Sequence, residues 1–202
     1  MPMPDLTSTH NRSFLLAFVC IAMMSVLSSC DENYVPRPRG YFRIDLPEKS
    51  YINYSGNCPV EMEIPAYSKV ELFKEYDSAD SCWFNLVFPK NNARIYCTYL
   101  PVQGDVDKMI SDSYAFAFKH EMKADAITRT AIQDDERKVY GLIYDIKGEA
   151  ASQVQFFLTD SSQHFLRGAL YFSNRPNQDS LAPVLSFLRD DIQHLTETLV
   201  WR

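Results

Sequence analysis

Residues 138–172 read KVYGLIYDIKGEAASQVQFFLTDSSQHFLRGALYF, and this stretch decides the fold. Apolar and polar side chains alternate through three segments, Lys138–Ile146, Val154–Thr159 and His164–Phe172, which short polar turns separate. Alternation with a period of two is typical of β-strands that bury one face. Because the turns are short, we expect neighbouring strands to run antiparallel.

The alternation continues toward the N-terminus and is interrupted twice by helical spacing. Further strands are predicted over Tyr41–Leu46, Val60–Ile64, Val70–Leu72, Cys82–Phe88, Arg94–Leu100 and Ile127–Ile132. Apolar residues at helical spacing predict amphipathic helices over Val106–Phe118 and Leu181–Leu199. Runs of strands broken by two helices predict an α+β fold. We expect one domain, residues 41–202, whose mostly antiparallel sheet of about eight strands is covered by the two helices.

Residues 1–29 have the composition of a bacterial signal peptide. One positive charge, Arg12, precedes the apolar run Phe14–Leu27, which is too short to span a bilayer. The run ends in Leu27-Ser28-Ser29-Cys30, which matches the lipobox, where a peptidase cuts before the cysteine and its sulfur receives lipid. We therefore predict acyl chains such as palmitate on Cys30 and an anchored spacer over residues 30–40. An uncleaved anchor or an ordinary secretory signal is the alternative.

The cysteines beyond the leader indicate one disulfide. Cys58, Cys82 and Cys97 remain in an oxidising envelope compartment, and three thiols allow one bridge. We favour Cys58 with Cys82, because the loop of about 24 residues that they close is worth roughly 3 kcal/mol in the chain-entropy account. Cys97 lies within a strand pattern and is expected to be a buried thiol.

Charge and motif content exclude several classes of function. The chain has 20 Lys and Arg against 26 Asp and Glu, a net charge of −6, so we expect no nucleic-acid partner. Its six glycines form no phosphate-binding loop, and its cysteines and histidines fit no zinc template, so neither cofactor nor metal is predicted. Nucleophile-elbow and zinc-protease motifs are absent as well, and we therefore expect the protein to have no enzymatic activity.

One polar patch has residue types found at catalytic sites. Asp160, Ser161 and His164 bring a carboxylate, a hydroxyl and an imidazole within five residues. The favoured interpretation is a hairpin turn, because Asp and Ser at strand ends hydrogen-bond to local backbone. The alternative is a small-ligand or glycan-binding site, with or without hydrolytic activity.

Other side chains are candidates for binding a partner protein. Trp83, Tyr140 and Tyr144 alternate with apolar neighbours. If both faces of the sheet are this apolar, the helices or another protein must cover the second face. Arg167, inside an apolar strand, has two interpretations: a cation on the solvent face or an anchor for a partner.

The chain beyond the leader resembles the gliding-motility lipoprotein GldD family of Bacteroidetes. The segments that support this resemblance extend from the spacer to the C-terminus and are residues 36–44 (PRPRGYFRI), 82–85 (CWFN), 138–141 (KVYG), 155–157 (QFF), 159–161 (TDS), 164–172 (HFLRGALYF) and 197–201 (ETLVW).

The resemblance implies a lipid-anchored envelope protein required for gliding and for the associated type IX secretion system. Its expected role is that of a non-enzymatic accessory or assembly subunit, whose partners are the lipid bilayer and other envelope proteins of that machinery. The outer membrane, periplasmic face, is the favoured location. The inner membrane is the alternative, because Asp31 follows Cys30 and an Asp there retains lipoproteins in the inner membrane of enterobacteria.

Overall fold

The computed structural model describes residues 44–56, 58–73, 82–119, 124–173 and 178–202. All of them belong to one compact unit, Phe42–Arg202. The predicted signal peptide, Cys30 and the spacer lie outside the described residues, so these expectations stay predictions.

The fold is α+β, as predicted. Its elements in chain order are β1 (Tyr51–Ser55), β2 (Val60–Pro65), β3 (Lys69–Leu72), β4 (Cys82–Phe88), the 3-10 helix η2 (Pro89–Asn91), β5 (Ala93–Pro101), α2 (Val106–Phe118), β6 (Ala124–Asp134), β7 (Val139–Gly148), β8 (Ser152–Thr159), β9 (His164–Phe172), α3 (Gln178–Thr198) and β10 (Val200–Trp201).

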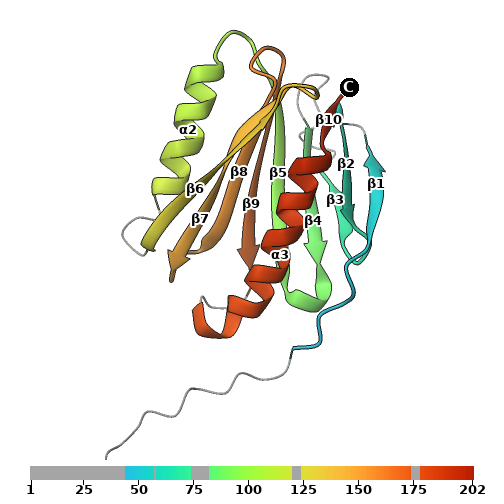
Figure 1. Ribbon diagram of the computed structural model, residues 1–202, viewed down its shortest axis with the longest axis vertical. Helices are drawn as coiled ribbons and strands as arrows, with labels where there is room; N and C mark the ends of the chain where they lie inside the picture. Colours follow the sequence, from blue (N-terminus) through green and yellow to red (C-terminus); the bar gives the residue numbers. More distant parts are fainter. Residues whose placement is uncertain (1–43, 57, 74–81, 120–123, 174–177) are drawn as a thin grey trace, which may run out of the picture. The chain divides into compact units, whose positions relative to one another are not determined.

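The strands form two antiparallel sheets (Figure 1). The large sheet has seven strands in the order β3-β4-β5-β9-β8-β7-β6, and the small sheet has three in the order β1-β2-β10. Three hairpins of the large sheet turn through a residue with positive φ, namely Asn92, Lys138 and Ser161. Short connections of this kind hold consecutive strands in fixed register, and the predicted meander over residues 138–172 is confirmed.

Strand β8 shows why the large sheet needs cover on both sides. All eight of its residues are buried. Because successive side chains point to opposite faces of a sheet, neither face of β8 is open to water. We call the two sides the α3 face and the α2 face after the helix that packs on each.

The α3 face carries the larger core. Phe84, Leu86, Ile95, Leu166 and Leu170 point to this side of the sheet and are no more than 1% exposed. The apolar stripe of α3 and the inner side of β2 pack against them, through Val184, Leu188, Ile192, Leu195, Leu199, Val60, Met62 and Ile64. The ring of Phe156 lies against Gly168, where a Cβ would come within 2.2 Å of it.

The α2 face holds a second, smaller core. Its buried residues are Ala117 of α2 together with Tyr144, Ile146, Ala150, Phe157 and Phe165 of the sheet and its connections. The rings of Phe157 and Phe165 stack with centroids 5.5 Å apart. Helix α2 therefore covers the part of this face formed by β7, β8 and the start of β9.

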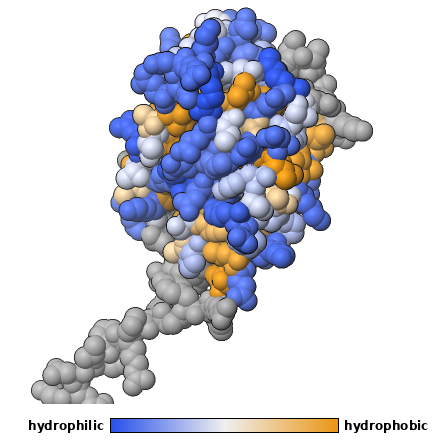
Figure 2. Space-filling model, turned by 45° about the vertical axis from the view of Figure 1, so that its right-hand side comes forward, coloured by the Kyte–Doolittle hydropathy of each residue, from blue (hydrophilic) through white to orange (hydrophobic). Residues whose placement is uncertain are grey.

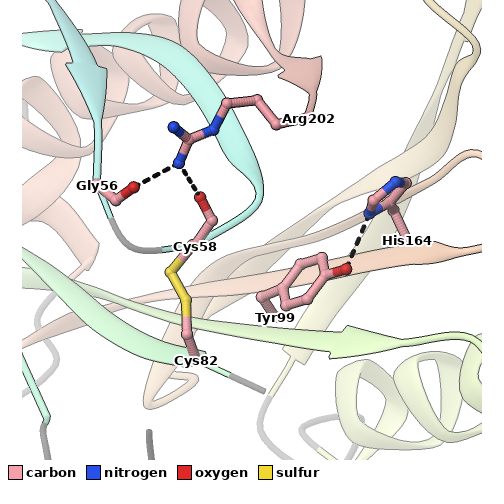
Figure 3. Close-up of a disulfide and its surroundings, with 6 residues drawn as sticks. All are labelled: Gly56, Cys58, Cys82, Tyr99, His164 and Arg202. Atoms are coloured by element: carbon pink, nitrogen blue, oxygen red, sulfur yellow. Dashed lines mark hydrogen bonds between the residues drawn. A yellow bond between two sulfur atoms is a disulfide. The ribbon is translucent and has the colours of Figure 1, made fainter. Parts of the chain in front are cut away.

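A disulfide joins the small sheet to the large one (Figure 3). Cys58, next to β2, is bonded to Cys82, the first residue of β4, with Cα atoms 5.7 Å apart, as predicted. Cys97 is a buried free thiol, and burial raises its pKa above the usual value. The Arg202 guanidinium donates hydrogen bonds to the carbonyls of Gly56 and Cys58, which fixes the C-terminus beside the bridge.

A buried carboxylate joins α3 to the small sheet. Asp191 is 1% exposed. It accepts hydrogen bonds from the Lys49 ammonium at 2.6 Å, from the Tyr51 hydroxyl at 3.0 Å and from the Tyr67 hydroxyl at 2.6 Å. Burial and the neighbouring carboxylate raise the pKa of Tyr51 to about 12 and also raise that of Tyr67, so both phenols remain donors at neutral pH.

The outer surface around β1 and β2 has both hydrophilic and apolar parts. Figure 2 brings the side of β1 and β2 forward and shows separate apolar patches in a largely hydrophilic surface. Isolated apolar side chains of this kind are normal for a protein surface.

Two details of the strand prediction are wrong. Residues 44–46 form no strand, although Tyr41–Leu46 was predicted as one; residues 41–43 lie outside the described part. Within the described residues the first strand is instead β1, which pairs there with β2 alone and has no buried side chain, so its sequence lacks clear alternation. Strand β10 has two residues and is too short to produce a pattern.

Replacing Asp191 tests the buried network. Asp191→Ala leaves the Tyr51 and Tyr67 hydroxyls without their acceptor and removes the carboxylate partner of Lys49, which keeps the Phe187 carbonyl alone. We therefore expect the free energy of unfolding to fall by about 3 kcal/mol in urea titrations. Asp190→Ala, at the exposed neighbouring position, is the matched control and should change it by less than about 0.5 kcal/mol. A loss below about 1 kcal/mol for Asp191→Ala would show that the network is not a major support.

Candidate functional site

The α2 face remains accessible over β4 and β5. Trp83 and Tyr96 point to this side and are 40% and 45% exposed. Trp83 pairs with Thr98 on β5, and Thr98 pairs with Arg167 on β9, so the three side chains form one row across three strands. Trp83 and Arg167, two of the predicted partner-binding residues, are thus brought to the same region.

A groove of about 540 Å³ opens on this region. It is lined by Arg94, Tyr96, Thr98, Arg167, Ala169, Tyr171, Phe172 and Ser173. In the β5–β9 register Tyr96 faces Ala169, and the pairs Arg94–Tyr171 and Thr98–Arg167 lie on either side. The small side chain of Ala169 leaves a hollow between two arginines. We call this feature the Arg94–Arg167 groove.

Arg167 is held at the border between the groove and α2. Its guanidinium carbon lies 4.0 Å from the centre of the Phe116 ring, and one nitrogen donates to the Gln155 side-chain oxygen at 3.4 Å. Burial lowers the pKa of this guanidinium. Arginine nevertheless keeps its charge in proteins, so Arg167 is a half-buried cation with a fixed orientation.

The other end of the groove is more exposed. Arg94 forms an ion pair with Glu71 at 3.2 Å, in which both side chains are well exposed to solvent. The rings of Tyr96 and Tyr171 meet edge to face with centroids 5.5 Å apart. The groove therefore combines two cations with two aromatic walls.

The remaining two partner-binding candidates lie elsewhere. The Tyr140 hydroxyl donates to Asp135 at 3.1 Å near the β6–β7 turn. Tyr144 is 1% exposed and belongs to the core under α2, so the expectation that it forms part of a binding surface is wrong. Tyr144 does point to the second face of the sheet, as its place in the alternating pattern indicates. Helix α2, rather than another protein, covers it there.

Sequence reasoning did not single out Arg94, Tyr96, Tyr171 and Phe116. Arg94 and Tyr96 fall on the outward positions of a predicted strand, and that alternation is the one signal available. Their meeting with Arg167 depends on the pairing of β5 with β9, which are separated by a helix and three strands.

The Asp160–His164 segment forms a turn. One oxygen of Asp160 accepts from the backbone N–H groups of Ser162, Gln163 and His164, and the other accepts from the Ser162 hydroxyl. Partial burial by itself raises the pKa of Asp160, but these hydrogen bonds outweigh it and lower the pKa to about 2. The carboxylate is thus committed to the β8–β9 connection.

Ser161 and His164 also have structural roles. Ser161 has φ of 66°, and its N–H donates to the Thr159 hydroxyl. His164 shares a hydrogen bond of 2.8 Å with the Tyr99 hydroxyl (Figure 3) and stacks on Trp201, with centroids 5.2 Å apart. Neither residue lines the Arg94–Arg167 groove.

Comparison with known proteins identifies the family. The description of the matching family is gliding motility lipoprotein GldD, and the match covers residues 31–201. The chain belongs to this family. Membership makes it a lipid-anchored envelope protein connected with gliding motility. No curated protein matches the chain.

Among solved structures, the chain is similar to the cyanobacterial PsbP protein (CyanoP) from Synechocystis sp. PCC 6803. The two are 12% identical, with a TM-score of 0.47, and the similarity covers 80% of this chain and 98% of the cyanobacterial one.

Two features are absent from the residues that the structure describes. Within these ranges no helix is both long and apolar enough to cross a membrane. The same part of the chain contains no group of three or more His, Cys, Asp or Glu side chains placed to hold a metal ion.

The pH dependence of stability tests the role of Asp160. Its lowered pKa means that its contribution is present above about pH 4 and is lost as the pH falls toward 2. Because the carboxylate is largely solvated, we expect Asp160→Ala to lower the free energy of unfolding by about 1 kcal/mol at pH 7 and by almost nothing at pH 2.

Asp125→Ala, at an exposed position of β6, is the matched control and should have little effect at either pH. A destabilisation by Asp160→Ala that stays constant from pH 7 to pH 2 would contradict this assignment.

Proposed function

We propose that this lipoprotein is a non-enzymatic accessory or assembly subunit of the gliding machinery and of the associated type IX secretion system. It binds other envelope proteins of that machinery and needs no cofactor beyond the lipid on Cys30. The outer membrane, with the domain on the periplasmic side, is the proposed location.

The observation that carries this proposal is the accessible part of the α2 face. Trp83, Tyr96 and Phe116 are 40%, 45% and 38% exposed, and the groove adjoins them. Exposed aromatic and arginine side chains are the residue types enriched at protein interfaces. On the α3 face, by contrast, the corresponding strands lie under α3 and the small sheet.

The predicted anchor restricts where such a partner is met. Eleven residues, 30–40, separate the lipidated end from the domain and span at most about 40 Å when fully extended. A domain tethered this closely meets partners at the membrane surface, where its effective concentration is raised.

The ligand-binding alternative at Asp160, Ser161 and His164 has weaker support. The oxygens of Asp160 and the ring of His164 are engaged in contacts within the fold. These contacts explain the polar pattern without a ligand.

Complementation of a deletion strain tests the proposal. Full-length Cys30→Ala and Trp83→Ala variants should fail to restore gliding and secretion, because one lacks the anchor and the other lacks an interface aromatic. Colony spreading and secreted-protein assays measure the two outcomes, with immunoblots to establish equal abundance.

Ser161→Gly is the matched control. It removes the hydroxyl of the alternative site and suits the positive φ at this position, so it should restore both activities. Full activity of the Cys30→Ala variant, or loss of activity in Ser161→Gly at normal abundance, would count against the proposed function.

A further inference from the structure

The Arg94–Arg167 groove concentrates positive charge on a protein whose net charge is −6. A third cation, Lys119, lies 4.5 Å from the centre of the same Phe116 ring that Arg167 contacts. Within the part of the chain that the structure describes, neither Arg167 nor Lys119 forms an ion pair with a carboxylate. Among the described residues, Arg94 is therefore the one cation of these three that has a carboxylate partner.

The environment of Arg167 makes a positive charge without a carboxylate partner energetically unfavourable in the free protein. The guanidinium is half-buried, and its partners are a neutral amide and an aromatic ring. A desolvated charge is stabilised best by an opposite charge within hydrogen-bonding distance. The fork of an arginine held in one orientation matches a carboxylate in particular.

From these contacts we propose that the groove binds an acidic segment of a partner protein, with carboxylate side chains at Arg167 and Arg94. The proposal rests on the proposed function and specifies the chemistry of the partner. The segment lies in extended form along β5 and β9, with Tyr96 and Tyr171 against its aliphatic parts.

The spacing of the two arginines favours a peptide over a small ion. Thr98, the register partner of Arg167, is four residues from Arg94 on β5, which separates the two ends of the groove by about 13 Å along the strand. Small-ligand sites usually enclose most of their ligand. Here Tyr96 is 45% exposed, and exposed aromatics continue beyond the groove at Trp83 and Phe116.

Peptide binding to the full-length, detergent-solubilised lipoprotein tests this proposal. The probes are fluorescent hexaglutamate and hexaglutamine peptides with blocked ends, each able to span about 20 Å, and fluorescence polarisation gives Kd. We expect hexaglutamate to bind at least tenfold more tightly than hexaglutamine. Arg167→Gln and Arg94→Gln should each weaken hexaglutamate binding about tenfold, the effect of losing one charge-assisted contact.

Arg129→Gln is the matched control, because Arg129 is exposed on β6, on the same face but outside the groove. It should leave the Kd unchanged within about twofold, and thermal melts establish that every variant is folded. If Arg167→Gln fails to fold, the more exposed Arg94→Gln still decides the result.

Three outcomes would overturn the proposal: equal binding of the two peptides, no binding of either, or equal losses in Arg129→Gln and Arg94→Gln. Citrate that binds as tightly as hexaglutamate would assign the groove to small polycarboxylates instead. Any of these results, combined with a Trp83→Ala variant that cannot glide, would leave the proposed function standing and remove only the acidic partner.

Discussion

The burial of strand β8 on both faces is the constraint on which the rest of the structure depends. Every residue of this strand is buried, so the sheet around it requires two covering layers. Helix α3 and the small sheet supply one layer along the length of the sheet, whereas the 13-residue helix α2 supplies the other over β8 and the start of β9. The aromatic and cationic surface of β4 and β5 is a direct consequence, because one short helix cannot cover seven strands.

The α3 layer is fixed by polar contacts as well as by apolar packing. The Asp191 carboxylate joins α3 to residues on both sides of β1 and β2, and the disulfide joins the beginning of β2 to β4. A buried carboxylate with three donors contributes little net stability over an apolar packing of the same volume, but it is costly to break and so fixes the position of the helix. The two faces therefore differ: one is closed by specific contacts, and the other is left partly accessible.

Much of this architecture is readable from the sequence, because strands that bury one face and helices with an apolar stripe carry strong local patterns. The hairpins and both helices followed from such patterns, and the disulfide followed from the number and spacing of the cysteines beyond the leader. Strand β1 was missed because it buries no side chain, and the covering of Tyr144 by α2 was missed because a pattern does not say what covers a face. The groove was beyond sequence reasoning for a related reason: Arg94 and Arg167 meet through the pairing of β5 with β9, a contact between segments about 70 residues apart.

The central claim is that another protein covers the groove in the cell, and cysteine labelling measures this directly. Ser173→Cys places a thiol at the groove with little change of volume, and Ser186→Cys places one on the exposed side of α3. A membrane-permeant maleimide is applied to living cells and to the purified lipoprotein, and the labelling rates are compared. We expect the thiol of Ser173→Cys to be protected in cells and reactive after purification, while the thiol of Ser186→Cys reacts equally in both. Equal labelling of position 173 in cells and in purified protein would contradict it.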